Sequence, residues 1–133
     1  MEQVIQQTLP RELQWPADST LGSLVDLRIV GRDSSGRVQQ LVVESTKGKW
    51  MVTGDRIRWI LSPRDRTILR SILFVMDVEK ESGVIVRVVV QGGGNGHGVG
   101  MCQMGAIEMA RRGYARDGIL AHYYPHTTVS PLY

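Results

Sequence analysis

Residues 84–103, VIVRVVVQGGGNGHGVGMCQ, decide the fold of this 133-residue chain. An apolar strand over Val84–Val90 is followed by a glycine run over Gly92–Gly100, and a helix is expected to begin at Met101. Valine and isoleucine suit a strand surface, whereas glycine permits positive φ, so the change in composition marks the end of the strand. The strand is apolar on both faces except at Arg87, which predicts a central position in its sheet.

The rest of the chain shows strands first and helices last. Alternation of apolar and polar residues indicates strands, glycine and proline mark the turns, and a 3.6-residue period indicates helices. Strands are expected over 25–29, 38–43, 50–52, 72–78 and 84–90, a short helix from Thr53–Asp55 to Pro63, and helices over 101–112 and 115–124. This order predicts an α+β fold, in which an antiparallel β-meander with one short helix precedes two C-terminal helices after the Gly-rich loop.

The N-terminal segment, residues 1–24, is difficult to assign. Val4, Ile5 and Leu9 suit one helical stripe, but Pro10 and Pro16 are expected to interrupt it. No linker or internal repeat is visible, so residues 1–133 are expected to form a single domain.

Bulk properties exclude several classes of protein. No run reaches the ~18–20 apolar residues of a membrane span, and the N-terminus lacks the basic start and apolar core of a signal peptide. A single cysteine, Cys102, excludes an internal disulfide. The net charge of +3 equals the excess of five arginines over two aspartates within residues 55–70. This window indicates either a solvated face with local ion pairs or a surface for an anionic polymer. Nucleic acid is not expected, because only Trp59 lies among these arginines as a stacking group.

The glycine run is the best candidate for a ligand-binding loop. Six of the nine residues of Gly92–Gly100 are glycine, a conformational cost that a plain connector has little reason to accept. A strand, a glycine loop and a helix also direct backbone N–H groups and the helix dipole at one point. Dinucleotide binding is excluded, because glycines spaced i, i+2 and i+5 occur in no register, and no Gly-Lys-Ser/Thr forms a phosphate loop.

Within and beside this run, specific residues are candidates for a site. His97 lies between two glycines, so neighbouring side chains do not shield its imidazole, and Gln103 offers an amide in the first helical turn. We expect His97 to act in this site, and Gln103 either to contact the same ligand or to cap the loop backbone. Supporting catalytic roles for His97 and Gln103 are what the family resemblance given below implies. Substrate-binding residues are expected at the positions Gly94, Asn95, Gly96, Gly98 and Gly100.

Cys102 permits two other interpretations. With His97, His122 and His126 it suggests a zinc set, but the spacing fits no known finger or zincin pattern. A Cys–His nucleophile pair lacks an orienting residue. We expect a buried, reduced cysteine, and neither a metal ion nor a cofactor.

The C-terminal third resembles the stage II sporulation protein D / amidase-enhancer (SpoIID/LytB) family. The resemblance covers roughly residues 25–133. The matching residues are Gly96-His97-Gly98-Val99-Gly100-Met101, Gln103, Gly105-Ala106, Met109-Ala110, Gly113, Ile119-Leu120 and His122-Tyr123-Tyr124-Pro125, with Ser35–Val38 and Thr53–Arg58 upstream. It implies the C-terminal portion of a peptidoglycan-acting domain in the cell envelope.

The family includes lytic transglycosylases and enhancers of a cell-wall amidase, so the expected partners are glycan strands and an amidase. Glycan cleavage needs a general acid, which the family places on a glutamate in an N-terminal segment that we expect this chain to lack. Residues 10–16 echo that segment only superficially, which leaves Glu12 as a weak candidate. Enzymatic activity is therefore left open, with a non-catalytic peptidoglycan-binding module or amidase enhancer as the alternative.

Overall fold

A computed structural model describes residues 2–13, 20–62 and 67–130. The chain divides into two compact units, Met1–His97 and Gly98–Tyr133. The strands belong to the first unit, and the second contains two helices that follow the glycine run. The predicted α+β class is confirmed.

Three strands of the first unit form an antiparallel meander. They are β1 (Leu24–Arg32), β2 (Val38–Ser45) and β3 (Gly48–Thr53), in the order β1-β2-β3. Residues 33–37 connect β1 to β2, and residues 46–47 connect β2 to β3, which begins at Gly48 and therefore earlier than the expected strand over 50–52. The side chains of Leu41, Val43 and Val52 are almost fully buried, and they fix which face of the sheet covers the core.

The next two strands form a separate hairpin. β4 (Phe74–Glu81) pairs antiparallel with β5 (Val84–Gly92) through a two-residue turn, in which Ser82 and Gly83 both have positive φ. The prediction that the valine-rich strand is central is wrong, because among the described residues β5 pairs with β4 alone. Ile85, Val88 and Val90 pack against the core, whereas Val86 is exposed where the register of the hairpin shifts between Glu79 and Lys80.

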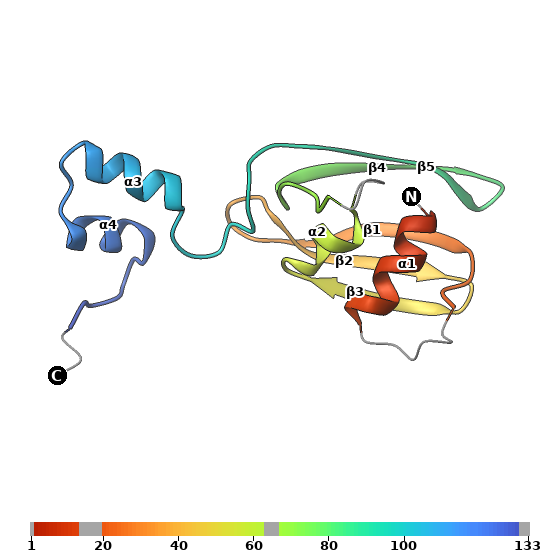
Figure 1. Ribbon diagram of the computed structural model, residues 1–133. Coiled ribbons are helices and arrows are strands. Elements are labelled where there is room, and N and C mark those ends of the chain that lie inside the picture. The colour runs from red at the N-terminus through yellow and green to blue at the C-terminus, as the bar shows by residue number, and fades with distance from the viewer. Residues whose placement is uncertain (1, 14–19, 63–66, 131–133) are drawn as a thin grey trace. The chain divides into compact units, whose positions relative to one another are not determined.

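Two helices complete the first unit. α1 (Glu2–Glu12) lies beside α2 (Arg56–Ile60), and the two share the core through Ile5, Leu9, Ile57 and Ile60 (Figure 1). Pro10 does not interrupt α1, contrary to the expectation. A proline inside a helix costs about 3 kcal/mol. Ile5 and Leu9 are completely buried, and the free energy gained by burying two such side chains offsets a cost of that size. α2 begins after Gly54, as predicted, while Pro63 and Pro16 lie outside the described residues.

The second unit is a helical hairpin of α3 (Gln103–Arg111) and α4 (Arg116–Tyr123). Gly113 adopts a φ of +88° after α3, which confirms it as the predicted helix stop. The helices approach closely at Gly105, where an added Cβ would lie 3.3 Å from the Cζ of Tyr123. None of the side chains in α3 or α4 is buried.

Candidate functional site

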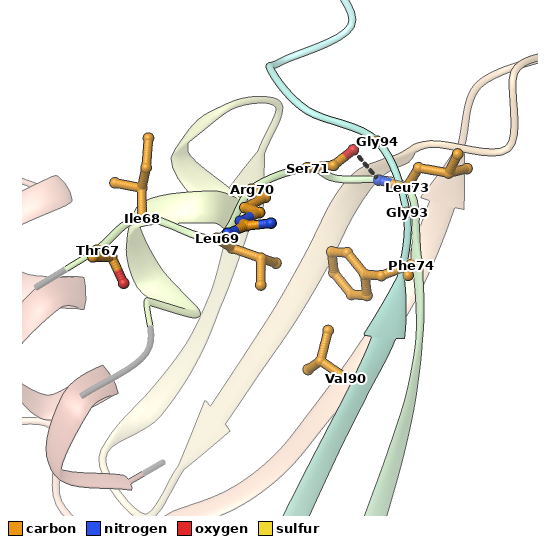
Figure 2. Close-up of a pocket in the computed structure, with 11 residues that line it drawn as sticks. Thr67, Ile68, Leu69, Arg70, Ser71, Leu73, Phe74, Val90, Gly93 and Gly94 are labelled. Carbon is orange, nitrogen blue, oxygen red and sulfur yellow. Dashed lines mark hydrogen bonds between the residues drawn. The ribbon is translucent and has the colours of Figure 1, made fainter. Parts of the chain in front are cut away.

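A pocket of about 560 Å³ lies at the end of β5, beside the first residues of the glycine run. Two segments far apart in the sequence form it, the connection before β4 and the glycine end of β5 (Figure 2). The lining residues are Thr67, Ile68, Leu69, Arg70, Ser71, Leu73, Phe74, Val90, Gly92, Gly93 and Gly94.

Backbone hydrogen bonds join these two segments. The N–H of Gly93 donates to the carbonyl of Leu73 at 3.0 Å, and the N–H of Gly96 donates to the carbonyl of Arg70 at 2.8 Å. Ser71 and Gly96 also form an isolated parallel bridge. The Ser71 hydroxyl oxygen accepts from the Leu73 N–H at 3.1 Å, the dashed line in Figure 2. The glycine run is thus fixed to residues 70–73.

Arg58 of α2 supports the connection from the other side. Its side chain is nearly buried, and its Nε donates to the Leu69 carbonyl at 2.7 Å. The same guanidinium pairs with Asp55 at 2.8 Å. One arginine of the basic window is therefore a structural link between a helix and the pocket wall, and not part of a solvated basic face.

The glycines of the run are required for different reasons. A Cβ on Gly92 would lie 2.7 Å from the Cβ of Phe74, so this position has no room for a side chain. Gly94 and Gly96 have φ of +87° and +96°, which L-residues rarely adopt. Gly93 has open space around it and no positive φ. The loop geometry therefore explains most of the glycines, and Gly93 is the exception.

The chemistry of the lining suits binding. Phe74 and Val90 supply apolar surface, Thr67 and Ser71 supply hydroxyls, and Arg70 is the one charged residue among the lining residues. An exposed guanidinium beside hydroxyls and backbone amides can recognise a carboxylate or a sugar hydroxyl. No carboxyl group is present among these described lining residues, so they provide no general acid.

The predicted site residues lie at several places. Gly94 lines the pocket, whereas Asn95 and His97 are exposed and not among its lining residues. His97 ends the first unit, and Gln103 is the exposed first residue of α3 in the second unit. The shared site for His97 and Gln103 stays a prediction. Gly98 and Gly100 both adopt positive φ.

Cys102 is exposed, so the expectation of a buried thiol is wrong. Its position explains the difference, because Cys102 is the N-cap of α3 and its sulfur accepts from the Gly105 N–H at 3.5 Å. Within the described ranges, no three histidine, cysteine, aspartate or glutamate side chains lie together in a way that would bind a metal ion.

Glu12 lies at the end of α1, away from the glycine run in sequence and outside the pocket lining. Its carboxylate is 3.8 Å from the Nε of Arg11. No helix in the described part of the chain is long and apolar enough to cross a membrane.

The sequence interpretation missed residues 67–74. In the sequence Arg70 stands out only for its charge, and nothing in its local pattern indicates that its carbonyl accepts a hydrogen bond from the Gly96 N–H. One signal in the sequence could have pointed to this segment. It lies between the arginine-containing helix α2 and β4, the strand that pairs with β5 and so ends beside the glycine run.

Residues 1–100 match the model of a family described as a domain of unknown function (DUF8618). The chain belongs to this family. The DUF8618 match includes both segments of the pocket, and α3 and α4 lie beyond it. The chain is also similar to the amidase enhancer of Bacillus subtilis (strain 168), with 30% identity over 126 residues. The alignment covers 86% of this chain and 17% of that protein, so the chain spans about a sixth of its relative's length.

Proposed function

We propose that this chain binds peptidoglycan glycan strands in the cell envelope, as the C-terminal portion of a SpoIID/LytB-like domain that supports a cell-wall amidase. The similarity to an amidase enhancer and the glycine-histidine motif support a role in the cell wall. The observation that carries a binding role is the pocket beside the glycine run, whose described lining has one arginine and no carboxyl group.

Peptidoglycan fits this lining because it combines uncharged sugars with carboxylates on its peptide stems. Arg70 is suited to a carboxylate, and the hydroxyls of Thr67 and Ser71 are suited to sugar groups. His97, Asn95, Gln103 and the glycines of the run remain candidates for further contacts with the strand. In a longer protein, an upstream glutamate segment would add strand cleavage of the lytic transglycosylase type.

The test is co-sedimentation of the full chain with purified sacculi. We expect salt-sensitive pelleting that Arg70→Ala weakens about fivefold, because ionic contacts to an exposed guanidinium are screened by salt. Arg111→Ala is the matched control, since it removes an exposed arginine from α3 and should pellet like the original chain. Equal pelleting of the Arg70→Ala variant and the original chain would contradict the proposal, as would an absence of pelleting at low salt.

A second pair of variants separates loop geometry from charge. Gly94→Ala places a Cβ at positive φ, 3.2 Å from the Ser71 hydroxyl oxygen, and should reduce pelleting. Gly93→Ala adds a methyl group in open space and should not. Soluble anhydro-muramyl products in the supernatant, abolished by Glu12→Gln, would instead show that this chain cleaves the strand itself.

A further inference from the structure

A second hollow, of about 450 Å³, lies between α1 and α2. It shares no lining residue with the pocket beside the glycine run. Its lining residues are Gln7, Thr8, Arg11, Glu12, Trp59 and Ser62. We call it the α1–α2 cleft.

Trp59 is the aromatic group among the described lining residues, and it is 38% exposed. Its neighbours on α2, Ile57 and Ile60, are fully buried. The short helix thus directs its isoleucines into the core and presents an indole at the surface. An indole offers a broad apolar face and one N–H donor, which makes it a stacking platform with a polar edge.

The polar lining residues come mainly from one face of α1. Positions 7, 8, 11 and 12 are spaced so that a helix places them side by side. The Thr8 hydroxyl donates to the Ile60 carbonyl at 3.2 Å and thereby joins α1 to α2. The charges of Arg11 and Glu12 cancel, so the described lining residues carry no net charge.

We propose that the α1–α2 cleft is a saccharide-binding site. The C–H face of an uncharged pyranose ring stacks on Trp59, and the Gln7 amide and Glu12 carboxylate bind its hydroxyl or acetamido groups. These planar side chains match such a ligand because an amide both donates and accepts, while a carboxylate accepts from hydroxyls. The site rests on its own lining and does not depend on the proposed role of the glycine-run pocket.

A nucleobase would also stack on an indole. Single-stranded nucleic acid, however, is bound in grooves that combine aromatic platforms with a net positive charge along the phosphate backbone. Among the described lining residues Arg11 is the one arginine, and its Nε lies 3.8 Å from the Glu12 carboxylate. The balance of charge favours an uncharged saccharide.

The experiment follows the indole N–H resonance of Trp59 in the ¹⁵N-labelled full chain, assigned by its loss in Trp59→Phe. We expect the tetramer of N-acetylglucosamine to move this resonance in a saturable way. Calorimetry then gives the dissociation constant of each variant. Trp59→Ala should weaken binding about tenfold, and Trp59→Phe only a few-fold. Tyr114→Ala removes another exposed aromatic, between α3 and α4, and should bind like the original chain.

Three results would overturn the saccharide assignment, and a fourth would overturn the independence of the cleft from the glycine-run pocket. The first is a Trp59 resonance that does not move at millimolar saccharide. The second is a Tyr114→Ala variant that loses as much binding as Trp59→Ala. In the third, a thymidine oligonucleotide moves the resonance at a lower concentration than the saccharide does. Arg70→Ala separates the two proposals: a shift that persists in this variant supports an independent cleft, and loss of the shift contradicts one.

Discussion

Asp33 organises the turn between β1 and β2. One carboxylate oxygen accepts from the backbone N–H groups of Ser35 and Arg37, and from the Ser35 hydroxyl at 2.6 Å. The other accepts from the Gln39 amide at 2.8 Å. The hydrogen bonds from the Ser35 hydroxyl and the Gln39 amide are the main causes that lower the pKa of Asp33 from 3.8 to about 2.

The lowered pKa of Asp33 predicts a pH-dependent stability. The folded state favours the ionised form, so the stabilisation is complete above pH 3.8 and is lost as the pH falls toward 2. Asp33→Asn should therefore lower the midpoint of thermal unfolding at pH 6, and the difference from the original chain should shrink below pH 3.8. Circular dichroism melts at pH 6, 4, 3 and 2 measure this, with the exposed Asp77→Asn as control. A deficit that stays constant down to pH 2 would contradict the assignment.

At the scale of elements, Arg58 connects α2 to the wall of the glycine-run pocket. Arg58→Met keeps the aliphatic stem and removes both the bond to the Leu69 carbonyl and the pair with Asp55. Hydrogen bonds to charged groups contribute about 1.5–3 kcal/mol, so the free energy of unfolding should fall by about 3 kcal/mol in urea titration. Arg56→Met, at the exposed start of the same helix, should change it by less than about 0.5 kcal/mol. If the two variants lose the same stability, the role given to Arg58 is wrong.

Elements with local signals could be predicted from the sequence. The meander follows from alternation between Val25 and Ile29 and the turns after it, and Gly113 ends α3 as expected. That β5 pairs with β4 alone among the described residues could not be predicted, because valines on both faces suit a central strand and a half-covered edge strand equally well. The sequence does not predict α1, because Pro10 argues against the helical stripe of residues 4–9, and the contacts that offset the cost of Pro10 are distant in sequence.

The candidate site also has one part that the sequence reveals and one part that only the fold reveals. The run from Gly92 to Gly100 is visible as composition, and the structure relates it to a pocket through Gly92, Gly93 and Gly94. The opposite wall depends on carbonyls of Leu69, Arg70 and Leu73, which every residue type possesses. A sequence pattern does not indicate which backbone carbonyls will accept hydrogen bonds. Arg70 and Ser71 could therefore be recognised as candidate binding residues only from the structure.

At the scale of the whole molecule, hydrophobic burial is distributed very unevenly. Every described side chain in the buried core lies between Ile5 and Phe74, within the first unit. In the second unit, α3 has nine residues and α4 has eight, and large apolar side chains such as Met104 (69%) and Ile107 (43%) are exposed. Helices shorter than about 12–15 residues are marginal in water unless a packed face stabilises them.

This distribution predicts different behaviour for the two units as separate fragments. The fragment 1–97 should unfold cooperatively in urea, because it contains the complete described core. The fragment 98–133 should show weak helical circular dichroism, because only close approaches such as Gly105 to Tyr123 connect its helices. Trifluoroethanol should raise that signal and so show that the fragment is competent to form helices. A sharp thermal transition of fragment 98–133 in buffer would contradict this view, since it would require a hydrophobic core that its described side chains do not form.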